Sequence, residues 1–172
     1  MDAKKIIRLA LGYGEKTYYF WCMEIKGKRL MIGGQALRQL GSTRWTEDTD
    51  YLVYDERVDE VFIHDRENNV DYCNAAKHPL FRKIWETQQG NEGPLASPQA
   101  LLELKLFAWV NHLVNGFLKK AVADESDIKF LMLEFPQLVE SKCTVWHVTT
   151  GQAGEIKKFL ADFRKLRDNA NS

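Results

Sequence analysis

One stretch of the sequence, residues 29–55, constrains the fold of this chain more than any other. It contains two short apolar runs of the kind that form buried strands, separated by a glycine pair, a helical run and a polar loop. These parts are, in order, residues 30–32, Gly33–Gly34, residues 35–40, residues 41–47 and residues 51–54, and Asp48-Thr49-Asp50 is expected to begin the second strand. The expected local structure is therefore strand, glycine turn, helix, loop and strand.

Two carboxylates, Asp48 and Asp50, lead into the second strand. Residues two apart in a strand point to the same face, so the two side chains are expected to lie side by side. Like charges this close repel one another and shift each other's pKa unless a cation lies between them. Magnesium, a hard cation that is held by a few carboxylates together with substrate phosphates, would remove this conflict.

The glycine pair suits a phosphate group. Gly33 and Gly34 allow a close backbone approach and unusual dihedral angles. The helix that follows would direct its free N–H groups and the positive end of its dipole at whatever lies over the turn. A phosphate site beside a metal site is the functional interpretation, and the alternative is an ordinary strand–turn–helix unit whose aspartates lie at a strand end.

The same stretch resembles the nucleotidyltransferase superfamily typified by DNA polymerase beta. The signature of that superfamily is an apolar residue, Gly, Gly or Ser, a spacer, and Asp-x-Asp on the next strand. Within it, the pattern G-G-x-A-L…G-x-x-R-x-T-x-D-x-D is most similar to the bacterial abortive-infection nucleotidyltransferase-like toxins and their relatives. The matching residues are Gly33, Gly34, Ala36, Leu37, Gly41, Arg44, Thr46, Asp48 and Asp50. Together they are more specific than a glycine pair or Asp-x-Asp alone.

The resemblance implies an α+β fold, in which a small mixed β-sheet nucleotidyltransferase core with flanking helices is followed by a C-terminal helical lobe. We expect the core in residues 1–90 and the lobe in residues 91–172, which completes a cleft. The run 89–98 is rich in Gly, Pro and small polar residues and is the candidate linker.

Hydrophobic periodicity predicts the remaining elements. Residues 17–25 are ambiguous, because their aromatic content favours a strand whereas the resemblance implies a helix, which we prefer. Strands are expected at 60–64 and 70–73, helices at 3–11, 75–89, 99–114, 125–135 and 154–168, and a short strand or extended turn at 143–148. Ser97 is the expected N-cap of the 99–114 helix, with Pro98 in its first turn.

Polymerase-beta-type enzymes place a third carboxylate on a neighbouring strand. Asp71 is the candidate, because apolar residues flank it in a short strand. Asp65 fits a turn position, and Asp55 is too close to the end of its strand. The alternative for Asp71 is a solvent-facing strand residue.

Two further candidates lie in the second half of the chain. Lys105 belongs to a run S-P-x-x-L-L-x-x-K-L-x-A that recurs in relatives of these toxins, whose lysine is implied to hold nucleotide phosphate in the active site. The alternative is a lysine that extends to solvent. Asp127 partly matches a family run R-x-x-K-D-x-x-D-I, but the arginine of that run is missing here. Its alternative is an acid that complements a helix dipole.

The resemblance implies a magnesium-dependent enzyme, for which manganese could substitute, that moves a nucleoside monophosphate from an NTP to a hydroxyl group. The implied acceptor is an RNA, such as a tRNA, or a protein, and the implied setting is a toxin–antitoxin or phage-defence system with an antitoxin as partner. Asp48 and Asp50 would hold the metal, and Asp71 would be a third ligand or a general base. The residues expected to contact the nucleotide are Gly33, Gly34, Arg44, Thr46, Lys105 and Asp127.

The alternative function is a catalytically inactive binding or regulatory module with the same fold. Composition does not decide between the two, because 24 Lys and Arg residues balance 24 Asp and Glu residues. An odd number of cysteines (Cys22, Cys73 and Cys143), without a secretory signal or membrane span, predicts reduced thiols and a cytoplasmic protein. The four histidines, His64, His78, His112 and His147, have no metal-ligand spacing.

Overall fold

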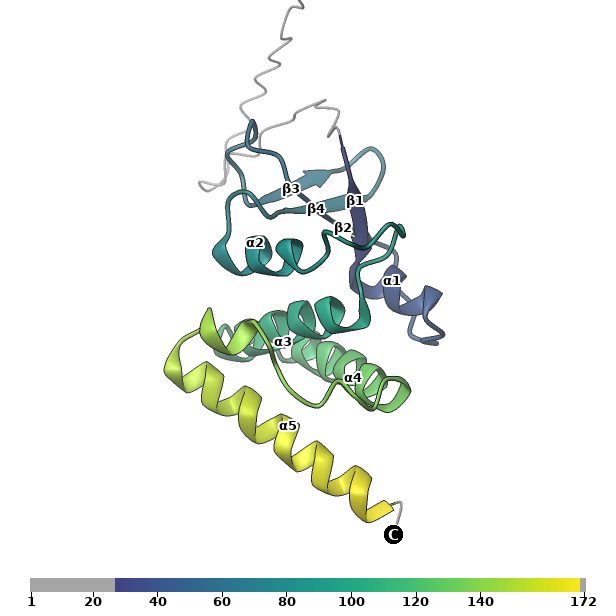
Figure 1. The fold of residues 1–172 in the computed structure, drawn as a ribbon, viewed down its shortest axis with the longest axis vertical. Helices are drawn as coiled ribbons and strands as arrows, with labels where there is room; N and C mark the ends of the chain where they lie inside the picture. Colours follow the sequence, from purple (N-terminus) through teal and green to yellow (C-terminus); the bar gives the residue numbers. More distant parts are fainter. Residues whose placement is uncertain (1–26, 171–172) are drawn as a thin grey trace, which may run out of the picture.

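The computed structural model describes residues 27–170, which form a mixed α+β fold with a four-stranded sheet and five α-helices (Figure 1). The strands are β1 (Arg29–Ile32), β2 (Thr49–Val53), β3 (Phe62–Asp65) and β4 (Val70–Asn74). The helices are α1 (Gly33–Gln39), α2 (Pro79–Glu86), α3 (Pro98–Val114), α4 (Leu118–Glu134) and α5 (Thr150–Ala170), with a 3-10 turn at Thr144–Trp146. The helices predicted at 3–11 and 17–25 lie outside the described residues.

The sheet has the strand order β1-β2-β4-β3. β2 is antiparallel to β1 and parallel to β4, and β4 is antiparallel to β3. Directly opposed residues of neighbouring strands share a face, so the register defines two rows of side chains on one face of the sheet. One row is Leu30, Leu52, Cys73 and Phe62, and the next is Ile32, Asp50, Asp71 and His64. The first row is apolar, and three of the four members of the second row are polar.

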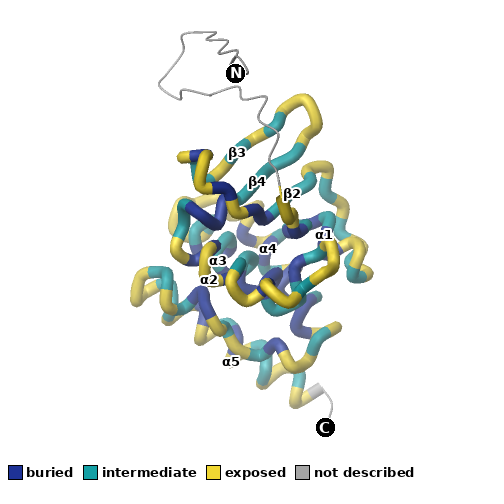
Figure 2. Tube along the Cα trace, turned by 45° about the horizontal axis from the view of Figure 1, so that its top comes forward, coloured by how far each residue is buried: buried dark blue, intermediate teal, exposed yellow. Residues whose placement is uncertain are grey.

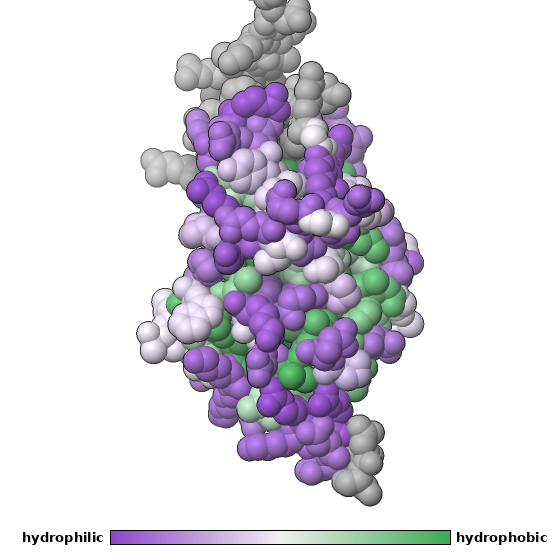
Figure 3. Space-filling model, viewed as in Figure 1, coloured by the Kyte–Doolittle hydropathy of each residue, from purple (hydrophilic) through white to green (hydrophobic). Residues whose placement is uncertain are grey.

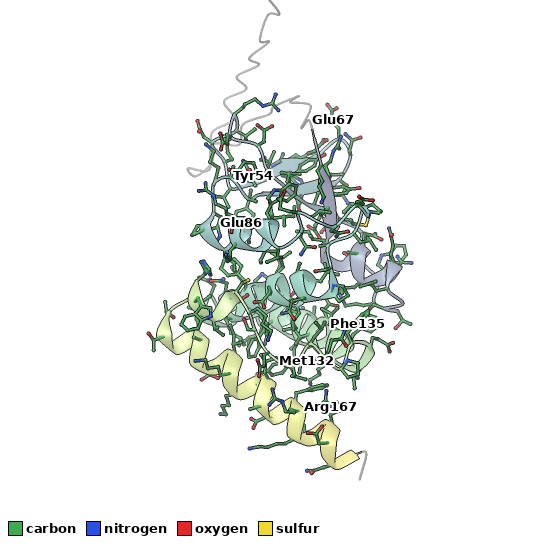
Figure 4. The ribbon with its side chains drawn as sticks, viewed as in Figure 1. Tyr54, Glu67, Glu86, Met132, Phe135 and Arg167 are labelled. Atoms are coloured by element: carbon green, nitrogen blue, oxygen red, sulfur yellow. The ribbon has the colours of Figure 1, made fainter. Side chains whose placement is uncertain are left out.

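Helices α2 to α5 lie in layers below the sheet, and α1 lies beside the end of β1 (Figure 1). Figure 1 shows α2 between the sheet and α3, with α4 beside α3 and α5 along the far side of both. One hydrophobic cluster joins these layers, and the buried segments in Figure 2 lie where the elements face one another. The cluster includes Leu52 from the sheet, Leu37 from α1, Ile84 from α2, Leu106 from α3, Met132 from α4 (labelled in Figure 4) and Ile156 from α5. Residues on both sides of position 90 therefore contribute to one core.

Local sequence signals explain where several helices begin. The Ser97 hydroxyl accepts a hydrogen bond from the Ala100 N–H at 3.3 Å, and Pro98 occupies the first turn of α3, as predicted. α2 begins at Pro79 rather than at residue 75, because the buried Asn74 side chain holds the preceding turn. Its Oδ1 accepts from the Ala76 N–H at 3.1 Å, and its Nδ2 donates to the Asp55 carbonyl at 2.8 Å.

The run 89–98 is not a free linker. Met31 pairs with Leu95 in a parallel bridge, with a 2.7 Å hydrogen bond from the Met31 N–H to the Pro94 carbonyl and a 3.0 Å bond from the Ala96 N–H to the Met31 carbonyl. The segment therefore covers the outer edge of β1, which would otherwise present unpaired backbone groups. Glycine and proline content did not reveal this pairing, because it depends on contacts between residues about 60 positions apart in the chain.

The strand or extended turn expected at 143–148 is wrong, since this segment forms the 3-10 turn. The buried carboxylate of Glu103 on α3 organises the segment by accepting several hydrogen bonds at once. Its donors are the Thr144 N–H at 2.7 Å, the Ser141 hydroxyl at 2.8 Å, the Gln99 side-chain amide at 2.8 Å and the Lys142 N–H. A carboxylate that collects donors in this way fixes a compact turn where alternating hydrophobicity suggests an extended chain.

Two helices are longer than their apolar stripes predicted. α4 begins at Leu118 rather than Glu125, directly after a turn in which Gly116 has a φ of +74°. α5 begins at Thr150 rather than Gly154, and the Thr149 hydroxyl accepts from the Gln152 N–H at 3.3 Å at its start. Figure 4 shows Arg167 near the other end of α5, where its guanidinium donates to the Pro136 carbonyl at 3.1 Å.

The face of the molecule seen in Figure 3 is largely hydrophilic, with smaller hydrophobic areas between the layers. Within residues 27–170, no helix combines the length and the apolar character that crossing a membrane requires.

Replacement of Glu103 by Gln tests whether this carboxylate organises the 3-10 turn. One carboxylate oxygen becomes an NH₂ group that faces backbone and side-chain donors, so at least one buried donor loses its acceptor. We expect the free energy of unfolding, measured by urea titration, to fall by about 1–3 kcal/mol. The same change at Glu92, which is exposed, should have no measurable effect, and equal stability of the two variants would contradict the assignment.

Candidate functional site

The candidate site begins where β1 turns into α1. Gly33 has a φ of +65°, a conformation that side chains other than glycine disfavour. A Cβ atom at Gly33 would lie only 1.9 Å from the Oδ2 atom of Asp50. The carboxylate of Asp50 therefore lies directly against the backbone of the turn, which the antiparallel pairing of Ile32 with Asp50 brings beside it.

Asp50 has a second carboxylate beside it on the other strand. Asp71 is its partner in the parallel ladder of β2 and β4, so the two side chains share one face of the sheet. Burial, and next the charge of Asp71, raise the pKa of Asp50 to about 6, although the positive charge of Lys105 partly offsets this. The pKa of Cys73, which follows Asp71 on the same face, rises to about 12 through burial and then the charges of Asp50 and Asp71. The carboxylates of Asp50 and Asp71 therefore concentrate negative charge at this end of the sheet.

His64 completes the polar row. It lies opposite Asp71 in the antiparallel pair of β3 and β4, and its Nδ1 atom contacts Asp71 Oδ1. Both side chains are about half exposed, so the pair is open to solvent on its outer side. Asp71 is thus partly exposed, as the alternative interpretation expected, but it also contacts His64 and lies beside Asp50.

Asp48 lies at the rim of the site. The strand begins at Thr49, so Asp48 precedes it, and the expectation of two carboxylates within one strand is wrong in this respect. Asp48 is exposed, and its Oδ1 accepts a hydrogen bond from the Asn69 side chain at 3.2 Å. Its charge still contributes to the raised pKa of Asp50.

Gly34 provides space for the loop that follows α1. A Cβ atom at Gly34 would lie 2.6 Å from Thr46 Cγ2 and 2.8 Å from a terminal guanidinium nitrogen of Arg44. The space above this glycine is therefore filled by two side chains of the chain itself. Both glycines of the pair allow a close approach, but the approaching groups are Asp50 at Gly33, and Arg44 and Thr46 at Gly34.

A buried network of charges joins this loop to the helices. Arg44 binds Asp127 through two nearly parallel hydrogen bonds, 2.6 Å from Nε to Oδ1 and 2.8 Å from Nη2 to Oδ2. Lys105 Nζ lies 2.8 Å from Asp127 Oδ2 and 3.0 Å from Asp124 Oδ1, and His112 Nδ1 lies 2.6 Å from Asp124 Oδ2. Two carboxylates of α4 are thereby matched by cations from α3 and from the loop.

Lys105 does not extend to open solvent, because only 14% of its side chain is exposed. Burial alone would lower its pKa, but the carboxylates of Asp124 and Asp127 outweigh burial and raise the pKa above its ordinary value. Lys105 is therefore a charged ammonium inside the protein. Asp127, whose side chain is 1% exposed, is balanced by Lys105 and Arg44 rather than serving as an exposed complement to a helix dipole.

Most of the predicted site residues therefore lie together: Gly33, Gly34, Arg44, Thr46, Asp50 and Asp71. Lys105 and Asp127 are linked to this group through Arg44. Asp48 lies at its rim. The sequence patterns did not indicate His64, His112 or Asp124 as members of the site. The hairpin could have revealed His64, since a polar turn at 65–69 between two short strands sets it opposite Asp71. No local signal pairs His112 with Asp124, because they lie on different helices.

Two carboxylates in register fit magnesium in donor chemistry, since this ion takes oxygen ligands and often uses only one or two carboxylates besides substrate phosphates. Among residues 27–170, no three His, Cys, Asp or Glu side chains are grouped closely enough to hold a metal ion by themselves. Any magnesium bound here would therefore depend on oxygen atoms from a substrate or from water.

Substitution of Gly33 by Ala tests the contact with Asp50. The new methyl group would overlap the Asp50 carboxylate and would impose a side chain at positive φ, so we expect a loss of about 2 kcal/mol or more in thermal or urea unfolding. Gly41→Ala is the matched control, because Gly41 has a φ of +104° but no atom within 4 Å of the added Cβ. Its loss should be smaller, at about 1 kcal/mol.

Removal of the Asp50 carboxylate tests whether its contact with the Gly33 backbone causes the expected loss of stability in Gly33→Ala. Asp50→Ala deletes the two closest atoms and leaves its own Cβ, 3.0 Å away. Gly33→Ala should therefore cost less in an Asp50→Ala background than in the wild type, and strictly additive losses would refute the contact.

The raised pKa of Asp50 predicts a pH-dependent stability. The folded protein holds the proton up to about pH 6, whereas the unfolded chain releases it near pH 4, so stability falls as pH rises through this window. Asp50→Asn should raise the free energy of unfolding by about 2–3 kcal/mol at pH 7.5, and the gain should vanish below pH 4. Asp48→Asn, at the exposed rim, should gain much less, and a gain for Asp50→Asn that is equal at pH 3.5 and 7.5 would be inconsistent with this mechanism.

No family model, curated protein or solved structure matches this chain. Its relation to the nucleotidyltransferase superfamily accordingly stays a prediction, based on residues between Gly33 and Asp50 and on the run around Lys105.

Proposed function

We propose that this chain is a magnesium-dependent nucleotidyltransferase that moves a nucleoside monophosphate from an NTP to a hydroxyl group of an RNA, such as a tRNA, or of a protein. Asp50 carries the proposal. Its carboxylate rests on the Gly33 turn, lies in register with Asp71, and has a pKa raised to about 6 by burial and by like charge. Burial and a neighbouring like charge both disfavour the ionised form of this carboxylate, and a bound cation would stabilise that form.

Asp50 on β2 is the principal candidate metal ligand, and Asp48, at the rim just before the same strand, is the second. When bound, magnesium would neutralise phosphate charge and polarise the phosphoryl oxygens. In the proposed reaction the acceptor oxygen forms a bond to the α-phosphorus, and the bond to the leaving pyrophosphate breaks in line with it.

Asp71 is the candidate to take the proton from the acceptor hydroxyl, because it lies beside Asp50 and is partly open to solvent. His64 holds one oxygen of this carboxylate, which limits its rotation and leaves the other oxygen for the proton. Arg44 and Lys105 would contribute positive charge for the triphosphate, since both already lower the pKa of Asp50.

A second candidate function is a binding or regulatory module that does not turn over substrate. One observation favours it: Arg44 and Lys105 are both paired with carboxylates of α4 instead of being directed at an open phosphate site. The role as a toxin with an antitoxin partner is compatible with either function and rests on the sequence resemblance.

The proposed transfer can be measured with four α-labelled NTPs, magnesium, and total RNA or lysate protein as acceptor. The wild type should transfer label with at least one NTP, and Asp50→Asn should reduce transfer by about 100-fold or more while remaining folded. Asp59→Asn, which removes a carboxylate from an exposed loop, should leave transfer unchanged.

Thermal unfolding with magnesium and each NTP separates the two functions. A rise in melting temperature with a magnesium–nucleotide indicates binding to the folded state. Binding without transfer to any acceptor would support the inactive module, and neither binding nor transfer with any nucleotide would reject the proposed enzyme.

A further inference from the structure

Trp45 is a strongly exposed tryptophan beside the candidate site. It leaves 69% of its surface in solvent, although tryptophan carries a large apolar surface that folding normally buries. Exposed tryptophan and arginine side chains are enriched where proteins bind ligands or partners. Trp45 belongs to the α1–β2 loop, three residues before Asp48, so it is part of the segment that borders the candidate site.

The loop around Trp45 is fixed on both sides. Arg44 and Thr46 both direct their side chains over Gly34, and the Gln35 side-chain amide donates to the Thr46 carbonyl at 3.0 Å. Arg44 is further held by its paired hydrogen bonds to Asp127. With both of its neighbours held over the turn, the backbone that carries the exposed Trp45 ring is fixed in position.

Arg38 supports the exposed ring. It follows Gly34 by one helical turn on α1, and its guanidinium carbon lies 4.6 Å from the centroid of the Trp45 ring. At this distance the guanidinium is stacked over the ring in a cation–π contact. Arg38 and Trp45, here called the Arg38–Trp45 platform, therefore combine a held aromatic ring with a positive charge.

We infer that the Arg38–Trp45 platform stacks a base of single-stranded RNA, which is the acceptor in the proposed transfer. Aromatic rings bind bases of any sequence by stacking, and adjacent arginines attract the phosphates of the same strand. The identity of the acceptor rests on the proposed function, whereas RNA binding by the platform does not.

Charge favours an RNA strand over a protein partner. Residues 35–46 contain no acidic side chain, and the acidic residues begin only at Glu47. Arg44 is paired with Asp127, so Arg38, stacked on the Trp45 ring, supplies the positive charge of the platform. An acceptor strand on the platform would meet positive charge first and the candidate metal ligands beyond it.

Fluorescence anisotropy with a labelled, single-stranded RNA of mixed sequence tests the platform at one fixed salt concentration. Trp45→Ala should weaken RNA binding by about 5- to 100-fold, and Trp45→Phe, which keeps an aromatic face, should retain most of the affinity. Trp146→Ala removes a tryptophan that is 79% exposed in the 3-10 turn and should leave RNA affinity unchanged. Because Trp45 is exposed, the Trp45 variants should keep the wild-type melting temperature.

The alternatives give different results. RNA affinity that is equal in the wild type and Trp45→Ala, or no RNA binding by the wild type, would overturn the inference and point to a protein partner. An equal loss of NTP binding in Trp45→Ala, measured by thermal shift, would assign the platform to the donor base and would also overturn it. Asp50→Asn should bind RNA normally but lose transfer, and Trp45-dependent RNA binding without any transfer would support the platform while rejecting the proposed enzyme.

Discussion

The balance of charge around Asp127 determines how the sheet and the helices meet. This carboxylate is almost completely buried, and a buried charge without partners is strongly destabilising. Its two partners come from different parts of the chain, Arg44 from the α1–β2 loop and Lys105 from α3. The requirement for both cations draws the loop against α4, and this places Arg44 and Thr46 over Gly34. The conformation of the Gly33–Gly34 turn thus depends on the ion network of Arg44, Lys105 and Asp127.

The same network limits what the site can do. Arg44 and Lys105 both lower the pKa of Asp50, yet both also bind carboxylates of α4. Arg44 directs two of its donors at Asp127, and Lys105 contacts Asp127 and Asp124. A triphosphate would have to share Arg44 with Asp127, since a guanidinium has five donors and this pair uses two of them. The same two cations therefore neutralise the buried carboxylates of α4 and are the candidates to contact a triphosphate. For this reason the sequence pattern is compatible with an enzyme and with an inactive module.

The sequence predicted best the features that depend on neighbouring residues. The strand before the glycine pair, the Ser97 cap and the long apolar helix after it follow from local patterns, and the structure contains all three. Features set by distant contacts were not predictable in this way. The pairing of residues 94–96 with Met31 and the 3-10 turn held by Glu103 each join segments that no short motif relates. For the site, Asp50 and Gly33 could be identified from their spacing, whereas their mutual contact required the register.

Register is the remaining constraint on the polar row of Asp50, Asp71 and His64. A slip of one residue between two strands would turn a complete set of side chains to the opposite face. The neighbouring row of Leu30, Leu52, Cys73 and Phe62 opposes such a slip, because it would move the fully buried Leu30 and Leu52 out of the core. Apolar burial therefore fixes the register, and the register brings two carboxylates and a histidine together at one end of the sheet. The unfavourable proximity of Asp50 and Asp71 is thus imposed by the packing of the adjacent row, and a bound cation would relieve it without any change of fold.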